Sequence, residues 1–310
     1  MWLKRKPLSE FSNTNSLQTT TQGIRQSTAP WRQSTESPTW YTDAEKYWNS
    51  VPATINGMLG GLGQLARPDA VSSLRFLSDF VSPPSSSSAS SIISPSTTSN
   101  NTGSAGSESL PATSTAAAAA VGSGSVKLTR TKLPLPGSGP SHVLDCGAGI
   151  GRVTKQVLIK AFDHVDLVEN CEAFVDQARN EYLKQEIEDG RVGEVRCSGL
   201  QNVHFEGTSW EGRFDVIWCQ WVLGHLTDVD LIAFFNRCKK GLKPGGMIFV
   251  KENNAKVGVV IDEEDSSMTR SDQVWKEMFV KSGLRLLKDD VQKGFPSGLF
   301  AVKMYALEPM

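Results

Sequence analysis

Residues 143–152 have the sequence Val-Leu-Asp-Cys-Gly-Ala-Gly-Ile-Gly-Arg, an apolar run that is interrupted by three alternating glycines. Apolar residues then recur at helical spacing at Val153, Val157, Leu158 and Phe162, so the stretch predicts a strand, a tight turn and a helix. Glycine lets a backbone approach a ligand that side chains would keep away, and the first turn of a helix offers unpaired N–H groups. The turn therefore predicts a nucleotide-binding site.

The spacing of the glycines and a neighbouring acid indicate which nucleotide binds. Gly147, Gly149 and Gly151 follow the pattern G-x-G-x-G rather than the dinucleotide pattern G-x-G-x-x-G, and Asp145 stands shortly before them. A carboxylate attracts the ammonium and sulfonium groups of S-adenosylmethionine (SAM), whereas it repels a pyrophosphate. The turn therefore favours SAM and disfavours an NAD-dependent dehydrogenase.

Composition limits the classes of protein to which the chain can belong. A length of 310 residues with 39% hydrophobic residues predicts one or two domains with a sizeable core. The net charge of −1 argues against a nucleic-acid partner, and no apolar run approaches the roughly 20 residues that cross a membrane. The five cysteines are widely spaced and form no CxxC pair, which predicts reduced thiols, no metal site, and a cytoplasmic or nuclear protein.

The first 41 residues predict a disordered tail. They are rich in Ser and Thr and contain five basic but only two acidic residues. A mitochondrial transit peptide has a similar composition, but it also needs an amphipathic helix, and the apolar face of such a helix is poorly developed here. We therefore expect an unstructured basic tail, with a transit peptide as the less favoured alternative.

Residues 42–81 predict an N-terminal helical lid. Thr42-Asp43-Ala44-Glu45 has the form of a capping box, which would start a helix that Pro52 stops. A second helix is expected at about 69–81, where apolar residues share one face. For Trp48 and Met58, packing against the main domain and covering an active site are equally consistent with the sequence.

Residues 82–140 predict a low-complexity, disordered insertion. Between residues 82 and 125, 16 of the 44 residues are serine, and Glu108 is the only charged residue. Such a segment cannot bury enough apolar surface to fold. Because the entropy of a loop grows slowly with its length, the preceding helices are still able to pack on the domain that follows.

Residues 141–310 alternate between strand-like and helix-like patterns, which predicts an α/β domain with a Rossmann-like sheet of seven strands. After the first strand, we expect strands at 165–169, 194–197, 215–219 and 247–251, and a final antiparallel hairpin of 284–287 with 300–307. Helices are expected at 172–188, 227–242 and 271–282. Glu169 ends the second strand, where an acid accepts the ribose hydroxyls of a nucleotide; the alternative is a solvated carboxylate.

Together with the Lys-Pro-Gly-Gly segment at 243–246, these patterns resemble the class I SAM-dependent methyltransferases over residues 141–310. Three segments resemble the protein N-terminal α-amino methyltransferases more narrowly. They are residues 145–152, the Trp-Cys-Gln-Trp-Val-Leu-Gly-His-Leu-Thr-Asp segment at 218–228, and the Asp-Glu-Glu-Asp-Ser-Ser segment at 262–267. Residues 47–48 and 57–61 are similar to the N-terminal helices of that family. Its members methylate the α-amine of proteins that begin with X-Pro-Lys after the initiator Met is removed.

The resemblance implies a role for individual residues of this chain. Those expected to bind SAM are Gly147, Gly149, Arg152, Glu169, Leu200, Gln201 and Gln220. Those expected to hold the peptide are Trp48, Trp221 and Asp262, and those expected to act in catalysis are His225, Asn253 and Asp265. No metal takes part in the implied reaction.

The chemistry of methyl transfer is consistent with these residue types. An amine must be neutral to attack a sulfonium methyl group, and an α-amine with a pKa of about 7.7–8.0 loses its proton far more readily than a lysine near 10.4. His225, Asp265 or both together are candidates for the base, and Asn253 for orienting the amine. Asp262 is expected to pair with the lysine of the peptide, and the tryptophans offer faces to proline and to a methylated ammonium.

Spacing alone also allows plainer interpretations. A single His after an apolar strand is commonly a core residue, and an acidic run such as 262–265 is commonly a solvated loop. Two other functions remain open: a methyltransferase for a different amine or small molecule, and a non-catalytic SAM-binding regulator. The paired tryptophans and the acidic loop argue against the first of these, and the presence of Asn253, His225 and Asp265 argues against the second.

Overall fold

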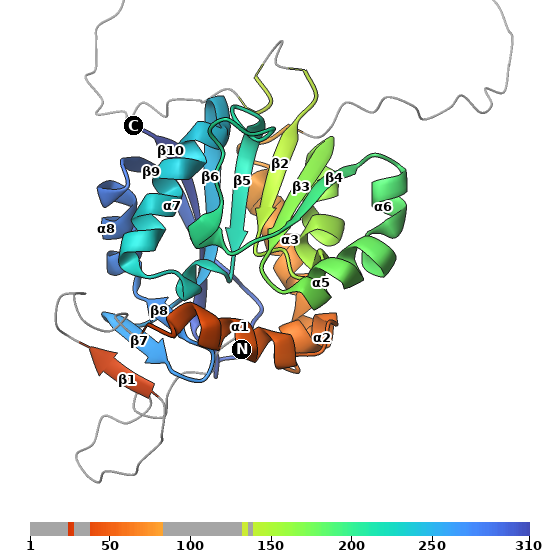
Figure 1. The fold of residues 1–310 in the computed structure, drawn as a ribbon. Helices are drawn as coiled ribbons and strands as arrows, with labels where there is room; N and C mark the ends of the chain where they lie inside the picture. The colour runs from red at the N-terminus through yellow and green to blue at the C-terminus, as the bar shows by residue number, and fades with distance from the viewer. Residues whose placement is uncertain (1–23, 28–37, 83–131, 136–138) are drawn as a thin grey trace, which may run out of the picture. The chain divides into compact units, whose positions relative to one another are not determined.

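The computed structural model describes residues 24–27, 38–82, 132–135 and 139–310 (Figure 1). Its larger sheet has seven strands in the order β4-β3-β2-β5-β6-β10-β9. In chain order they are β2 (His142–Cys146), β3 (His164–Glu169), β4 (Val192–Cys197), β5 (Phe214–Gln220), β6 (Leu242–Asn254), β9 (Leu284–Val291) and β10 (Ala301–Pro309). The predicted α/β architecture with a seven-stranded sheet is confirmed.

The pairing of the strands locates the ligand crevice of this sheet. β2 pairs in parallel with β3 on one side and with β5 on the other, so that Val143 lies between Val165 and Val216. β10 is antiparallel to both β6 and β9, as the predicted hairpin requires. The strand order therefore reverses between β2 and β5. In sheets of this kind, ligands bind beyond the carboxyl ends of the strands at such a reversal.

Helices cover both faces of the sheet because the strand residues that face each side are apolar. One face is covered by α3 (Ala66–Leu77), η3 (Thr154–Leu158), α4 (Ile159–Ala161), α5 (Glu172–Gln177), η4 (Ala178–Tyr182) and α6 (Lys184–Glu188). The other face is covered by α7 (Asp228–Gly241) and α8 (Asp272–Lys281). The single helix predicted at 172–188 is divided, because the η4 segment is π-helical and Leu183 N–H bonds the Ala178 carbonyl.

The N-terminal helices lie at the carboxyl ends of the parallel strands (Figure 1). They are α1 (Trp40–Ser50), α2 (Ile55–Met58) and the short η2 (Gly63–Leu65), which leads into α3. The predicted start of α1 at Thr42 is wrong, since the helix begins at Trp40 and the Thr42 hydroxyl donates to the Thr39 carbonyl instead of capping. Burial of Trp40, whose indole N–H donates to the His225 carbonyl at 2.7 Å, accounts for the earlier start.

A second, three-stranded antiparallel sheet has the order β1-β7-β8. β7 (Val259–Asp262) and β8 (Ser267–Arg270) form a hairpin whose turn contains the predicted acidic run. The sequence analysis did not anticipate this hairpin. It also did not anticipate β1 (Ile24–Ser27), which lies within the predicted tail and pairs with β7.

Most of the predicted 82–140 insertion lies outside the described residues. Leu133 is an exception, because it is buried and forms a parallel bridge with Val81 at the end of the segment that follows α3. Within the part of the chain that the structure describes, no helix is long and apolar enough to cross a membrane. The same residues contain no group of His, Cys, Asp and Glu side chains arranged to hold a metal ion.

Candidate active site

Three adjoining cavities lie where the strand order reverses. The nucleoside cavity encloses about 620 Å³ of unfilled space, part of it open to solvent, beside the ends of β2 and β3. A second cavity of about 320 Å³ lies beside the glycine turn, and we call it the tail cavity because the amino-acid tail of SAM is expected there. A third cavity of about 310 Å³ lies beside the β7–β8 hairpin, and we call it the acceptor cavity because the methyl acceptor is expected there. Gly147 lines the first two, Trp221 lines the last two, and Trp48 and His225 line the first and the third. The cavities therefore form one continuous site.

The glycine turn provides the wall between the nucleoside and tail cavities. Gly147 and Gly149 have positive φ angles of 68° and 58°, which other residues rarely adopt. A Cβ atom on Gly147 would lie 2.4 Å from the Val222 side chain, and one on Gly149 would lie 2.4 Å from the sulfur of Met58. Both positions therefore require glycine, and the backbone forms the surface that a ligand meets.

Glu169 supports this turn from the end of β3. Its carboxylate accepts the N–H groups of Gly149, Asn170 and Cys171, each at 2.9 Å. Burial raises the pKa of Glu169, while the three backbone hydrogen bonds oppose that rise. The side chain lines the nucleoside cavity, and it also holds the turn in place.

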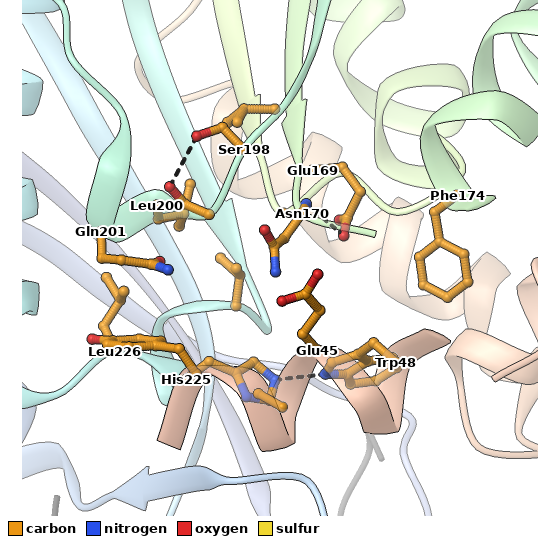
Figure 2. Close-up of a pocket in the computed structure, with 16 residues that line it drawn as sticks. Glu45, Trp48, Glu169, Asn170, Phe174, Ser198, Leu200, Gln201, His225 and Leu226 are labelled. Carbon is orange, nitrogen blue, oxygen red and sulfur yellow. Dashed lines mark hydrogen bonds between the residues drawn. The ribbon is translucent and has the colours of Figure 1, made fainter. Parts of the chain in front are cut away.

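Figure 2 shows the nucleoside cavity between α1 and the ends of the strands. Glu45 and Trp48 project from α1, opposite Glu169 and Asn170. The predicted residues Leu200 and Gln201 form a further wall after β4. Apolar side chains for a base ring and a carboxylate for a ribose make the cavity suitable for adenosine. The sequence analysis did not anticipate the lining residues Asn170 and Glu45, although Asn170 directly follows a predicted site residue.

The tail cavity contains both a basic and an acidic side chain. Arg152 is buried, and Asp145 lies at the end of β2, where it accepts the Thr154 hydroxyl at 2.7 Å. Burial raises the pKa of Asp145 to about 7, although the Thr154 hydrogen bond and the Arg152 charge oppose that rise. A cation and an acid in one cavity suit the carboxylate and ammonium of an amino acid. The donor set of the two cavities therefore suits SAM.

The acceptor cavity brings together residues from four separate parts of the chain. Trp48 comes from α1, Trp221 follows β5, His225 lies in η6 (Leu223–His225), Asn253 lies next to the last residue of β6, and Asp265 lies in the hairpin turn. Trp221 has a positive φ of 55°, an unusual backbone conformation that turns the chain sharply after β5. Its buried indole N–H has no hydrogen-bond partner among the described residues. This donor is therefore suited to an incoming ligand.

The contacts of His225 limit its role in this arrangement. Its Nδ1 lies 3.1 Å from the Ser266 carbonyl, and its Nε2 accepts the indole N–H of Trp48 at 3.1 Å. Nδ1 therefore carries the proton of a neutral ring, and the Nε2 lone pair is directed at Trp48. The Asp265 carboxylate, in contrast, is a buried acceptor that binds the Ser267 hydroxyl at 2.6 Å.

Asp262 does not line the acceptor cavity, unlike the other predicted peptide and catalytic residues. It ends β7, and its carboxylate accepts the Glu264 N–H at 3.1 Å. The pKa of Tyr47 on α1 is raised to about 12 by burial and by the charges of Asp265, Glu264 and Asp262. The hairpin therefore presents negative charge towards α1.

Glu252 is a lining residue of the acceptor cavity that the sequence analysis missed. Its carboxylate accepts the N–H groups of Val222 and Leu223, both at 2.8 Å, and so holds the segment after Trp221. Its position next to Asn253 at the carboxyl end of a parallel strand is the signal that would have identified it.

The chain is similar to known proteins along most of its length. The sequence family described as AdoMet dependent proline di-methyltransferase matches residues 36–94 and 125–308. Alpha N-terminal protein methyltransferase 1 of Arabidopsis thaliana is 39% identical over 273 residues, which cover 88% of this chain and 81% of that protein. N-terminal Xaa-Pro-Lys N-methyltransferase 1-B of Xenopus laevis is 34% identical, covering 86% of this chain and 95% of that protein. The solved structure of a SAM-dependent methyltransferase from Leishmania major aligns with a TM-score of 0.62 and 31% identity, covering 87% of this chain and 83% of that one.

Proposed function

Because this chain belongs to the AdoMet-dependent proline dimethyltransferase family, we propose that it methylates the α-amine of proteins with an N-terminal Xaa-Pro-Lys sequence. SAM supplies an electrophilic methyl group on its sulfonium and leaves as S-adenosylhomocysteine. The S–CH₃ bond breaks as the N–CH₃ bond forms, and the amine gives up one proton. The protein has to bind both molecules, remove that proton and align the amine.

The observation that supports this proposal is the position of the acceptor cavity. It shares Trp221 with the tail cavity and Trp48 with the nucleoside cavity, so an amine inside it lies next to the cofactor site. Its walls carry two indole rings, an amide and the two carboxylates of Glu252 and Asp265. Indole faces attract a proline ring and an ammonium group, and carboxylates attract the ammonium further.

We assign the proton-accepting role to Asp265. Its buried carboxylate lines the acceptor cavity, and a carboxylate is the side chain there that can take up the proton of an incoming ammonium. His225 is a positioning residue, because its Nε2 holds the indole of Trp48 against the cavity. Asn253 lies at the end of β6 in the same cavity, where its amide is suited to orienting the peptide.

The acidic residues of the β7–β8 hairpin account for the proposed preference for a basic residue at the third position of the substrate. Asp262 lies outside the acceptor cavity, and its charge reaches Tyr47 on the facing helix. A peptide whose α-amine occupies the cavity would extend outward, and a lysine two residues along would meet this negative field. The hairpin is therefore suited to recognising the peptide beyond its first residue.

The test is methyl transfer from labelled SAM to a peptide that begins Ser-Pro-Lys. Two matched controls are the same peptide with an acetylated N-terminus and one with Lys replaced by Glu. We expect methylation of the free Lys peptide, none of the acetylated one and much less of the Glu peptide. Equal labelling of all three would place the acceptor elsewhere in the peptide. No labelling despite SAM binding would favour a different acceptor or a non-catalytic protein.

We also propose a cytoplasmic location that extends to the nucleus. Support comes from the cysteines, which are all free thiols, four of them buried. The check is microscopy of the full chain with a C-terminal fluorescent tag, which leaves the N-terminus unchanged. Signal confined to mitochondria would instead support the transit-peptide alternative for the first 41 residues.

A further inference from the structure

Asp69 is a fully buried carboxylate outside the set of residues that the sequence analysis assigned to the site. It lies in the first turn of α3, only 1% exposed, and α3 packs across one face of the large sheet. A buried carboxylate is unfavourable unless opposite charges and hydrogen bonds compensate for its lost hydration. The partners of Asp69 therefore show why the chain keeps a charge in this position.

The Asp69 side chain contacts three residues that stand at the carboxyl edge of the sheet. Its Oδ2 accepts Arg152 Nη1 at 2.8 Å, and its two oxygens accept Gln220 Nε2 at 3.0 and 2.9 Å. Lys251 Nζ lies 2.5 Å from Oδ1. Arg152 follows the glycine turn, Gln220 ends β5, and Lys251 lies near the end of β6. Asp69 therefore joins α3 to all three segments.

These contacts leave Arg152 and Gln220 in fixed orientations. Both residues line the tail cavity, whereas Asp69 and Lys251 do not. Among the described residues, Asp69 is the only hydrogen-bond partner of the Arg152 guanidinium, so its other N–H groups are available to a ligand. The Gln220 amide is held at both ends, because its Oε1 accepts the Trp218 indole at 3.2 Å while its nitrogen donates to Asp69.

The buried cluster contains one acidic side chain, Asp69, and two basic ones, Arg152 and Lys251. Burial would raise the pKa of Asp69, but Lys251 and Arg152 outweigh it and lower that pKa, so the carboxylate is ionised. Lys251 is completely buried and is also held by Ser73 Oγ at 2.9 Å and Gln292 Oε1 at 2.7 Å. One acid thus balances one of two cations, and Arg152 is the cation at the cavity wall.

We propose that Asp69 is a positioning residue of the cofactor site, which aims Arg152 at the carboxylate of the cofactor's amino-acid tail. The tail cavity is then complete only when α3 is docked, because Asp69 reaches the cluster from that helix. This inference rests on the proposed function, since it needs a cofactor with such a tail. Under this proposal α3 contributes to the cofactor site, although its residue Asp69 acts only through Arg152 and does not touch the ligand.

The test compares the binding of two ligands by calorimetry. S-adenosylhomocysteine carries the amino-acid tail, whereas 5′-methylthioadenosine lacks both its carboxylate and its ammonium. In the Asp69→Asn variant, we expect S-adenosylhomocysteine to bind roughly 10- to 100-fold more weakly, as for the loss of a charge-assisted hydrogen bond. Binding of 5′-methylthioadenosine should change by less than about threefold, because that ligand does not use Arg152.

Ser73→Ala is the matched control on the same helix. Ser73 is also completely buried and contacts the same cluster, but only through Lys251. If Asp69 merely anchors α3, both variants should weaken the binding of the two ligands equally, and that result would overturn the inference. Unchanged binding of both ligands by Asp69→Asn would overturn it as well. Selectively weaker binding of S-adenosylhomocysteine by Asp69→Asn, but not by Ser73→Ala, supports it.

A second variant keeps the test usable if Asp69→Asn does not fold. The double variant Asp69→Asn with Lys251→Met removes one charge of each sign, so the buried cluster keeps its net charge while Arg152 loses its anchor. The same selective loss of the tailed ligand is expected. If the wild-type protein itself fails to bind S-adenosylhomocysteine, the proposed function fails; if it binds and the variants discriminate nothing, only the role of Asp69 fails.

Discussion

At the scale of single residues, the site depends on buried polar groups whose partners decide what each can do. His225 and Asp265 line the same cavity, yet the Nε2 atom of His225 is directed at Trp48, while Asp265 binds a small hydroxyl. Asp145 and Asp69 are both buried carboxylates near Arg152, but their pKa values shift in opposite directions. The charges of Lys251 and Arg152 outweigh the burial of Asp69 and lower its pKa, whereas burial outweighs the Thr154 hydrogen bonds and the Arg152 charge at Asp145 and raises its pKa.

Replacing Asp265 tests the assignment of the base. In Asp265→Asn we expect kcat to fall by about 100-fold or more, since general bases contribute roughly 10²- to 10⁴-fold. Affinity for S-adenosylhomocysteine should stay within about threefold, because Asp265 lines neither cofactor cavity. Steady-state kinetics and calorimetry measure the two quantities. Glu263→Gln is the control, because Glu263 is exposed in the same turn and lines none of the three cavities, so its kcat should remain close to that of the wild type. An active Asp265→Asn enzyme would refute the assignment.

Asp145 makes the stability of the ligand-free protein depend on pH. Its pKa is raised to about 7 in the folded protein, whereas an ordinary Asp titrates near 3.9. Between these values the folded state binds more protons than the unfolded state, so the contribution of Asp145 to stability falls as pH rises. Asn cannot ionise, so the stability of Asp145→Asn relative to wild type should rise by about 2 kcal/mol or more between pH 5 and pH 7.

Urea unfolding of both proteins across this pH range measures that difference. Glu188→Gln is a suitable control, because Glu188 is exposed at the end of α6. Its stability relative to wild type should hardly change with pH. A flat difference for Asp145→Asn as well would mean that the folded protein does not hold a proton on Asp145 near neutrality.

At the scale of elements, short helical segments and turns position the site on a rigid sheet. η6 carries His225 from the end of β5 towards the hairpin, and α7 begins directly after it. Thr227 caps α7, since its hydroxyl oxygen accepts the Asp230 N–H at 3.1 Å. The backbone N–H of Thr227 donates to the Tyr41 hydroxyl of α1 at 3.3 Å. This cap therefore links the helix, the His225 segment and α1.

Removing the cap should destabilise the protein without touching the cavities. Thr227→Ala is expected to lower the free energy of unfolding by about 1 kcal/mol, the usual contribution of an N-cap side chain. Thr42→Ala is the matched control, because Thr42 is exposed in the first turn of α1 and does not cap that helix. Its effect should stay within about 0.5 kcal/mol. Chemical denaturation measures both variants, and equal stabilities would show that the Thr227 cap contributes nothing.

At the scale of the whole molecule, the N-terminal helices, the sheet and the hairpin meet around one continuous site. α1 supplies Trp48 to the acceptor cavity, and α2 supplies Met58 to the tail cavity. Segments more than 100 residues apart in sequence therefore line the same space, as in the Trp48–His225 contact across 177 residues. A ligand that fills the site should stabilise the molecule as a whole.

Thermal unfolding tests this with the ligand that the glycine turn favours. At a SAM concentration of 100 times Kd, we expect about 2.7 kcal/mol of stabilisation, which corresponds to a rise in Tm of roughly 5–10 °C. NAD at the same concentration is the control and should leave Tm unchanged, since its pyrophosphate would meet Asp145 and Glu169. A shift with NAD but not with SAM would reverse the interpretation of the turn.

The sequence was sufficient for features that depend on local pattern. Strand periodicity and the alternating glycines predicted the seven-stranded sheet and the turn at Gly147, because apolar spacing and glycine conformation act over only a few residues. The family resemblance named six residues for peptide binding and catalysis, and all of them except Asp262 line the acceptor cavity. The start of α1 was misplaced, since the long-range contact of Trp40 with His225 outweighs a local capping pattern.

Three features required the folded chain. The β7–β8 hairpin placed Asp265 of the acidic run in the wall of the acceptor cavity, the indole of Trp48 met the Nε2 atom of His225, and Asp69 joined a cluster with Arg152 and Lys251. Each arises between segments that are distant in sequence, and no local pattern encodes their meeting. Local residue preferences thus determined the elements and the class of ligand. Long-range packing determined which residues share the acceptor cavity and which acids lie beside basic side chains.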